Sequence, residues 1–141
     1  MTPLWKQLPV SSTLWLGVMV FLQYGMLLLF CWLNRRYNGP MLLVAACAVC
    51  NFAAMCGNGF RMPVDSIIYQ YDLFEGFVSR VASGELAEYV IVDHTAPLWF
   101  LGDVFPVTVI SPGLASVGDV LLGAGVFWLL QKCMVKTRVK E

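Results

Sequence analysis

Three long apolar runs, separated by polar breaks, dominate the hydropathy pattern of the 141-residue chain. The first run, residues 13–33, contains no charged residue, and the second, residues 41–57, is interrupted only by Asn51. The third run, residues 117–134, carries Asp119 near its start. A helix needs about 20 predominantly apolar residues to cross the hydrocarbon core of a bilayer. The pattern therefore predicts three transmembrane helices in a single integral membrane domain that comprises the whole chain.

The connections between these runs differ in length. Asn38-Gly39-Pro40 is a turn signal that ends the first helix and begins the second. The second connection, residues 58–116, is long and is expected to lie outside the lipid. Within it, Asp65 or Ser66 is expected to cap an amphipathic helix that ends at Ser83-Gly84. Apolar residues recur there at intervals of four and three, which is typical of one face of a helix; they are Ile67, Tyr71, Phe74, Val78 and Val81.

The stretch that follows Gly84 is apolar, but prolines, glycines and charged residues interrupt it. It is too broken to span a membrane, and we expect either a short strand or a re-entrant element that forms the lid or floor of a pocket. Non-helical backbone at membrane depth is tolerated only where it is buried in protein or lines a cavity. The expected fold class is an all-α membrane protein, with three transmembrane helices, an extracytoplasmic amphipathic helix and a broken apolar loop.

The composition agrees with a membrane protein, because 59% of the residues are hydrophobic and 13% are charged, against about 25% charged in soluble domains. The formal net charge is zero, so the chain has no excess of positive charge that would indicate a nucleic-acid partner. All acids except Glu141 fall on one side of the expected membrane. By the positive-inside bias, we expect the N-terminus outside and the C-terminus in the cytoplasm. The basic residues on the expected cytoplasmic side are Arg35, Arg36, Lys132, Lys136, Arg138 and Lys140.

Short motifs surround the second and third runs. They are NGP (residues 38–40), NGFRMPV (residues 58–64), LGD (residues 101–103) and SVGDVLLGAGVF (residues 116–127). In these motifs the chain resembles an uncharacterised bacterial family of integral membrane proteins, catalogued as a domain of unknown function. The likeness covers residues 38–134. It implies a polytopic protein of the bacterial plasma membrane and brings no activity with it.

Two of the stretches also resemble lipoprotein signal peptidase in placement and direction. That family carries one catalytic aspartate after a GN-x-x-DR motif and another in the AD that opens its last span. The corresponding stretches here are GNGFRMPVD (residues 57–65) and SVGD (residues 116–119). The chain departs from the family pattern, because no acid precedes Arg61, the last motif lacks the Asn and Ala, and the intervening loop is far longer. The resemblance implies an outer-leaflet hydrolase with paired aspartates.

Asp65, Asp103 and Asp119 are the candidate catalytic residues, since all three are expected near the outer membrane face. Two aspartates close together in an apolar setting share one proton, as aspartyl hydrolysis of an amide requires. Structural roles are the alternative. Asp119 fits the third helical position of a capping box that begins at Ser116, and one residue can have both roles. Asp103 is equally a solvated acid or an ion-pair partner for Arg61.

Four other residues are candidates for binding. Arg61 and Asn58 lie near the outer end of the second run, where a guanidinium matches the phosphate of a lipid headgroup. Asn51 fits a hydrogen bond between helices better than a ligand contact. His94 is the only histidine, so one chain cannot supply a histidine pair for a metal or haem. Neither a metal nor another cofactor is expected.

The function expected first is that of a non-enzymatic accessory or scaffold subunit of a larger membrane complex, with the acidic outer loop as a docking surface. The alternative is an outer-leaflet hydrolase, or a lipid-headgroup site, built from the paired aspartates. Three helices leave much surface uncovered, so the expected partners are membrane lipid and either other membrane subunits or a second copy of the chain. Small residues let helices approach closely, and Gly118, Gly123 and Gly125 thin the third helix in this way.

Overall fold

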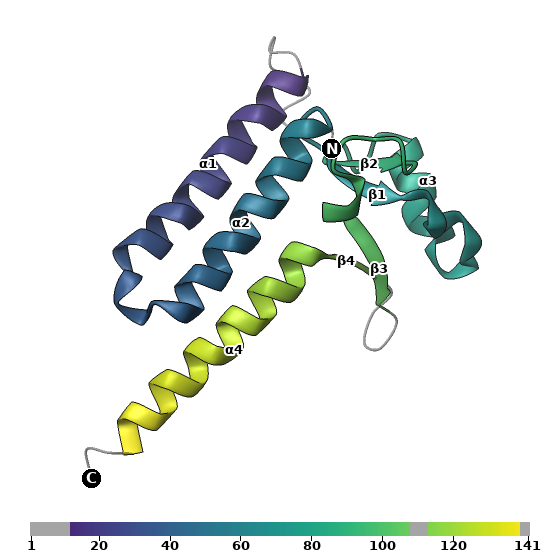
Figure 1. The fold of residues 1–141 in the computed structure, drawn as a ribbon. Helices are drawn as coiled ribbons and strands as arrows, with labels where there is room; N and C mark the ends of the chain where they lie inside the picture. Colours follow the sequence, from purple (N-terminus) through teal and green to yellow (C-terminus); the bar gives the residue numbers. More distant parts are fainter. Residues whose placement is uncertain (1–11, 108–112, 139–141) are drawn as a thin grey trace.

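Three long helices form the core of the architecture in the computed structural model, which describes residues 12–107 and 113–138 (Figure 1). They are α1 (Ser12–Leu33), α2 (Gly39–Gly57) and α4 (Val117–Arg138). Each is long and apolar enough to cross a membrane. The three helices expected from the hydropathy pattern are confirmed.

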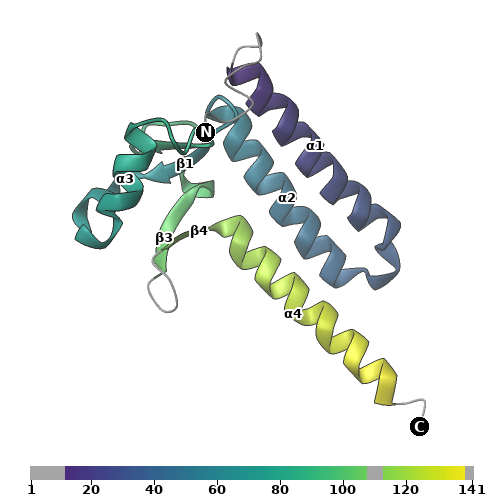
Figure 2. The same cartoon turned by 180° about the vertical axis from the view of Figure 1, so that it is seen from behind.

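The helices α1 and α2 form a hairpin (Figures 1 and 2). A short 3-10 helix, η2 (Arg35–Tyr37), joins them, followed by Asn38, whose φ of 35° asparagine tolerates better than most residues. Pro40 lies in the first turn of α2, where an N–H would have no intrahelical partner. Two buried clusters hold the hairpin together, one around Val20, Tyr24 and Ala48 and the other around Cys31, Met41 and Val44.

The third helix, α4, starts opposite the middle of α2 and runs past the turn between α1 and α2 (Figures 1 and 2). Gly118 at the start of α4 lies against Asn51, and Gly125 lies against Val44. Trp128 reaches Gly39, the first residue of α2. The last part of α2, residues 52–57, therefore projects beyond the start of α4, by about 9 Å at 1.5 Å per residue.

A four-stranded sheet lies beside this end of α2 (Figure 1). Its order is β2-β1-β3-β4, with β1 parallel to both β2 and β3, and β4 antiparallel to β3. The strands are β1 (Met62–Asp65), β2 (Tyr89–Val92), β3 (Asp103–Val107) and β4 (Gly113–Ser116).

The sheet corrects the expectation of an all-α fold. Of the two alternatives for the broken apolar stretch, the short strand is the one that forms. β-Branched residues favour strands, and three of the four residues of β2 are β-branched. Strands of four or five residues are too short to produce a strong periodic signal in the sequence.

The expected amphipathic helix of the outer segment is divided into three pieces. Two 3-10 helices, η3 (Ser66–Gln70) and η4 (Asp72–Phe74), precede the α-helix α3 (Glu75–Ala82). The extended backbone of Tyr71 (φ −120°, ψ 109°) separates the first two pieces. Its side chain consequently leaves the expected apolar face and is 41% exposed. The buried cluster beneath these pieces consists of Val64, Ile68 and Phe74.

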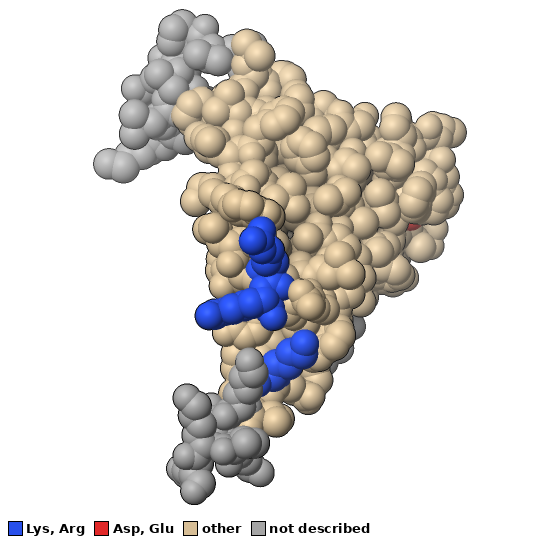
Figure 3. All heavy atoms as spheres, turned by 60° about the vertical axis from the view of Figure 1, so that its left-hand side comes forward, with Lys and Arg blue, Asp and Glu red and all other residues tan. Residues whose placement is uncertain are grey.

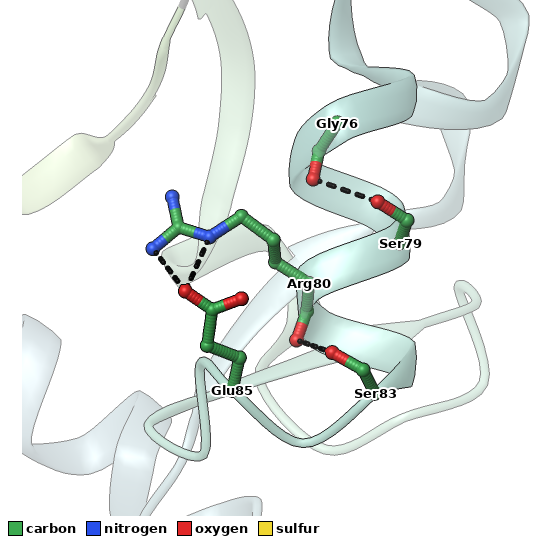
Figure 4. Close-up of polar contacts among 5 residues, drawn as sticks. All are labelled: Gly76, Ser79, Arg80, Ser83 and Glu85. Carbon is green, nitrogen blue, oxygen red and sulfur yellow. Dashed lines mark hydrogen bonds and ion pairs between the residues drawn. The ribbon is translucent and has the colours of Figure 1, made fainter. Parts of the chain in front are cut away.

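Local hydrogen bonds fix the end of α3 (Figure 4). Arg80 binds one carboxylate oxygen of Glu85 through both Nε and Nη2, each at 3.0 Å. The Ser83 hydroxyl donates to the Arg80 carbonyl at 3.1 Å. Gly84 follows with a φ of 73°, a left-handed conformation that glycine adopts without steric cost. The expected end of the helix at this glycine is confirmed.

The packing of α4 on α2 predicts different effects for two glycines of α4. A Cβ atom at Gly118 would overlap the Asn51 side chain, whereas a Cβ atom at Gly123 would have nothing within 4 Å. We expect Gly118→Ala to lower the free energy of unfolding by about 1–3 kcal/mol, the usual cost of overpacking. Gly123→Ala should be neutral or raise it by up to about 1 kcal/mol, because alanine is the better helix former. Unfolding in mixed micelles, followed by circular dichroism, measures both, and equal losses would contradict this packing.

Candidate functional site

A polar cavity of about 240 Å³ lies where the α1–α2 hairpin, the sheet and the start of α4 meet. Carboxyl, phenol and amide groups line it, and no Lys, Arg or His side chain is among its described lining residues. The cavity is therefore acidic, and its lining comes from α1, α2, α4 and the strands β1, β2 and β3. Its polar side chains are Gln23, Tyr24, Asn51, Glu88, Tyr89, Asp103 and Asp119.

Ser116 joins the sheet, α4 and α2 at the edge of this cavity and is fully buried. Its backbone N–H donates to Asp119 Oδ2 at 2.8 Å, and the Asp119 N–H donates to Ser116 Oγ at 3.1 Å, which completes the expected capping box. The Ser116 hydroxyl lies 2.9 Å from Asp119 Oδ2 and 3.2 Å from Asn51 Oδ1, and it donates to one of them at a time. The cap uses a single carboxylate oxygen of Asp119 and leaves Oδ1 without a hydrogen bond from the described residues.

Asp103 lies at the start of β3, directly across the antiparallel ladder from Ser116, which puts the two Cα atoms about 5 Å apart. Asp103 is 8% exposed, and burial and the charge of Asp119 act on its carboxyl without a hydrogen bond from a described residue. No buried side-chain oxygen of the described residues lacks a partner, so the carboxyl oxygens of Asp103 are accessible from the cavity that they line. Burial, followed by the nearby charge of Asp119, raises the pKa of Asp103 to about 7.

The surroundings distribute the charge unequally between the two aspartates. Asp119 receives two hydrogen bonds from the serine cap and lies at the positive end of a helix dipole. The Asp103 carboxyl is buried and receives no hydrogen bond from a described residue. Its burial disfavours the ionised form. The surroundings therefore favour the neutral form of Asp103.

A second cavity of about 240 Å³ adjoins the first, since Asp103 and Tyr89 line both. Its other side chains are apolar and include Phe74, Phe77 and Leu114. Phe77 packs edge-on against Tyr89, with ring centroids 5.3 Å apart. Burial and then the charge of Asp103 raise the pKa of Tyr89, so its hydroxyl stays protonated. A group bound at the carboxyl pair would have an apolar recess beside it.

Asp65, the third candidate aspartate, belongs to a different cluster. Its Oδ1 accepts the N–H of Ile67 at 2.9 Å and caps η3, as expected. Its Oδ2 lies 3.2 Å from Nε2 of His94. The His94 ring in turn stacks on Trp99 of the 3-10 helix η5 (Trp99–Leu101), with ring centroids 4.1 Å apart. Both Asp65 and His94 therefore have structural partners outside the cavity.

Sheet geometry explains why Asp65 does not join Asp103. The partner of Asp103 in β1 is Val64, and successive side chains of a strand point to opposite faces of the sheet. Asp65, one residue further along, consequently faces away, and it lines neither cavity. The aspartates that the structure brings together are Asp103 and Asp119.

Asn58 and Arg61 also lie outside the cavity. The Asn58 Nδ2 donates to the carbonyls of Ala54 and Pro97, both at 2.8 Å, and thereby ties the end of α2 to the loop that precedes η5. Arg61 is half-buried and forms no ion pair with another described residue. The alternative of an ion pair between Arg61 and Asp103 is therefore not observed.

Six of the lining residues were not predicted from the sequence, among them Tyr24, Glu88 and Tyr89. The tyrosines are amphipathic residues within apolar stretches, which is a weak signal, and Glu88 follows a turn where acids are common. Asn51 was predicted as a hydrogen-bond donor between helices; its Oδ1 instead accepts from Ser116, the last residue before α4. Among the described residues, no group of three or more His, Cys, Asp or Glu side chains is placed to hold a metal ion.

Sequence comparison assigns the chain to a family. It belongs to a family of unknown function, DUF5317, whose model matches residues 6–131. The match confirms the expectation of an uncharacterised family and extends it through the first helix. No curated protein and no solved structure matches the chain. The likeness to lipoprotein signal peptidase stays a prediction.

The buried carboxyl of Asp103 predicts that the protein loses stability as the pH rises. Its pKa is about 7 in the folded protein and 3.8 when solvated, so the folded state holds a proton that the unfolded chain releases between these values. The stability from this proton is complete at lower pH and is lost toward about pH 7, at roughly 1.4 kcal/mol per pH unit. Unfolding of the wild type and of Asp103→Asn in micelles, compared across this range, measures the effect. Parallel curves for the two proteins would contradict it.

Proposed function

We propose that this member of the DUF5317 family is a membrane-embedded hydrolase that uses Asp103 and Asp119 as a proton-sharing pair. The observation that carries the proposal is the shared cavity, in which a buried carboxyl without a donor lies beside one held by a helix cap. Two carboxyl groups in this arrangement supply an acid and a base together. The substrate class is an amide or ester of a membrane-associated molecule, with an apolar group for the adjoining recess.

The proposed reaction consumes one water molecule. Asp119 takes a proton from the water as its oxygen attacks the carbonyl carbon, and Asp103 gives its proton to the carbonyl oxygen. In the second step the proton on Asp119 passes to the leaving amine or alcohol as the C–N or C–O bond breaks. Asp103 then recovers a proton from the hydroxyl that becomes the new carbonyl oxygen. Both carboxyl groups return to their starting states.

The helix cap is compatible with this role. The cap occupies Oδ2 of Asp119, so Oδ1 remains for the attacking water. Catalytic groups need supporting hydrogen bonds that hold them within about 0.5 Å of the productive geometry. Ser116 supplies that support and is a positioning residue. Stabilising the helix and orienting a base are thus two consequences of one set of hydrogen bonds.

The orientation in the membrane is a further part of the proposal. Arg35 and Arg36 lie in the turn between α1 and α2, at the opposite end of the hairpin from the sheet (Figure 1). By the positive-inside bias, this turn would face the cytoplasm of a bacterial plasma membrane. The carboxyl site and the sheet would then face the outside.

Loss of either aspartate should abolish hydrolysis. We expect Asp103→Asn and Asp119→Asn each to reduce the rate at least about 100-fold, since positioned acid–base groups contribute 10²–10⁴-fold. Glu85→Gln, which alters an exposed acid on the same outer part of the chain, should stay within about twofold of the wild type. Wild-type activity should fall as the pH rises through about 7, where Asp103 loses its proton.

The measurement is cleavage of an internally quenched, N-acylated peptide library in liposomes that contain the full chain. Circular dichroism of each variant separates loss of chemistry from loss of folding. An inactive wild type, or aspartate variants that retain activity, would refute the hydrolase.

An accessory subunit remains the second candidate, and a groove on the outer part of the chain favours it. The groove has a volume of about 590 Å³ and lies between the 3-10 turns and α3. Tyr69 and Tyr71, which line it, are 64% and 41% exposed, and tyrosine is enriched at protein interfaces. Asp72 and Glu75 give it an acidic rim. This surface corresponds to the acidic docking loop expected from the sequence.

The accessory role predicts a stoichiometric partner that depends on this groove. Tyr69→Ala with Tyr71→Ala should reduce co-purification of the partner from native membranes in mild detergent by at least about tenfold, because buried interface tyrosines contribute 1 kcal/mol or more each. Asp103→Asn is the control, since Asp103 lies outside the groove and should leave the complex intact. A wild-type protein that purifies without a partner in fixed ratio would rule out this role.

A further inference from the structure

The hairpin carries a groove at the end opposite the carboxyl site. It lies between the end of α1 and the start of α2 and has a volume of about 490 Å³. Leu42, on its wall, is 71% exposed, so the groove opens on a surface that lipid would cover. The remaining apolar walls are Leu28, Cys31, Trp32, Met41 and Ala45.

Arg35 is the charged residue among the described lining of this groove. Its guanidinium lies 5.2 Å from the centroid of the Trp32 ring, and it forms no ion pair with another described residue. No Asp or Glu is among the described residues that line the groove. An arginine fork without an acidic partner is suited to bidentate contact with a phosphate.

Further positive charge comes from α4. The Lys132 Nζ lies 5.1 Å from the centroid of the Trp128 ring, and that ring lies against Gly39, which also lines the groove. Figure 3 shows the Lys and Arg side chains gathered on this face without an acidic side chain among them. Tryptophan together with Arg or Lys at helix ends is typical of the level of lipid headgroups.

We propose that this groove binds one anionic phospholipid of the adjacent leaflet. An acyl chain lies along the apolar walls, and the headgroup phosphate binds Arg35. Basic pockets between membrane helices recognise anionic headgroups by the same combination of charge and apolar surface. The site shares no residue with the carboxyl cavity, so it does not depend on the proposed hydrolase.

Native mass spectrometry of the full chain in detergent, titrated with phosphatidylglycerol or phosphatidylcholine, tests the proposal. We expect one phosphatidylglycerol per chain to bind at least about fivefold more tightly than phosphatidylcholine, as one basic contact at a membrane surface predicts. Arg35→Gln should remove this preference.

Arg36→Gln is the matched control. It removes the same charge from the neighbouring position, but Arg36 donates to the Tyr37 hydroxyl at 3.3 Å and does not line the groove. Its effect on phosphatidylglycerol binding should stay within about twofold, since a phosphate on Arg35 is retained. Equal losses in the two arginine variants, or no preference between the lipids, would overturn the proposal.

The apolar half of the site has its own test. Ala45→Phe places a phenyl group where the acyl chain would lie and should weaken binding of both lipids, with circular dichroism as the check on folding. Glycerol phosphate, which has the headgroup phosphate without acyl chains, should show no binding at the concentrations that saturate phosphatidylglycerol. Unchanged lipid binding in a folded Ala45→Phe variant, or tight binding of glycerol phosphate, would also overturn the proposal. If this variant does not fold, the comparison of the two arginine variants still decides.

Discussion

A buried hydroxyl needs hydrogen-bond partners, and the Ser116 hydroxyl has them in two helices, α2 and α4. Ser116 ends β4 opposite Asp103, caps α4 through Asp119 and lies within hydrogen-bond distance of Asn51 in α2. One fully buried residue thus connects the sheet with two of the helices. The two aspartates meet because both are neighbours of this serine, one across the ladder and one along the helix.

The helix α4 starts opposite the middle of α2, and this position determines the surroundings of Ser116. With α2 across a bilayer, a helix that starts opposite Asn51 begins within the membrane rather than at its surface. Its first N–H groups then need partners from the protein, and the capping box provides one for Asp119 and one for the preceding N–H of Ser116. Strand backbone beside the last turns of α2 is tolerated there only if it is enclosed or lines a cavity. The polar cavity is therefore a consequence of where α4 starts, which in turn follows from the close approach of Gly118 to Asn51.

The sequence predicted the features that rest on local rules and missed those that rest on tertiary pairing. Apolar length predicted the three helices, and the spacing of Ser116 and Asp119 predicted their capping box. The pairing of β1 with both β2 and β3 joins segments that are distant in the chain, so no local pattern reveals it. The same pairing decides which aspartates meet, because a shift of one residue along a strand turns Asp65 away from Asp103. The candidate set could be drawn up from the sequence, but the selection of a pair required the register of the sheet.

The two ends of the hairpin meet the same electrostatic requirement in different ways. Buried or membrane-level charge needs compensation. The carboxyl cavity has no cation among its described lining residues, and burial raises the pKa of Asp103 to about 7, so protonation of this carboxyl lowers the charge in the cavity. In the proposed hydrolase the same proton is the acid. At the other end Arg35 has no acidic partner among the described residues of its groove. A guanidinium keeps its proton under ordinary conditions, and the counter-charge that we propose for it is a lipid phosphate. The difference in acid strength between a carboxyl and a guanidinium therefore makes one end of the hairpin suited to proton transfer and the other to anion binding.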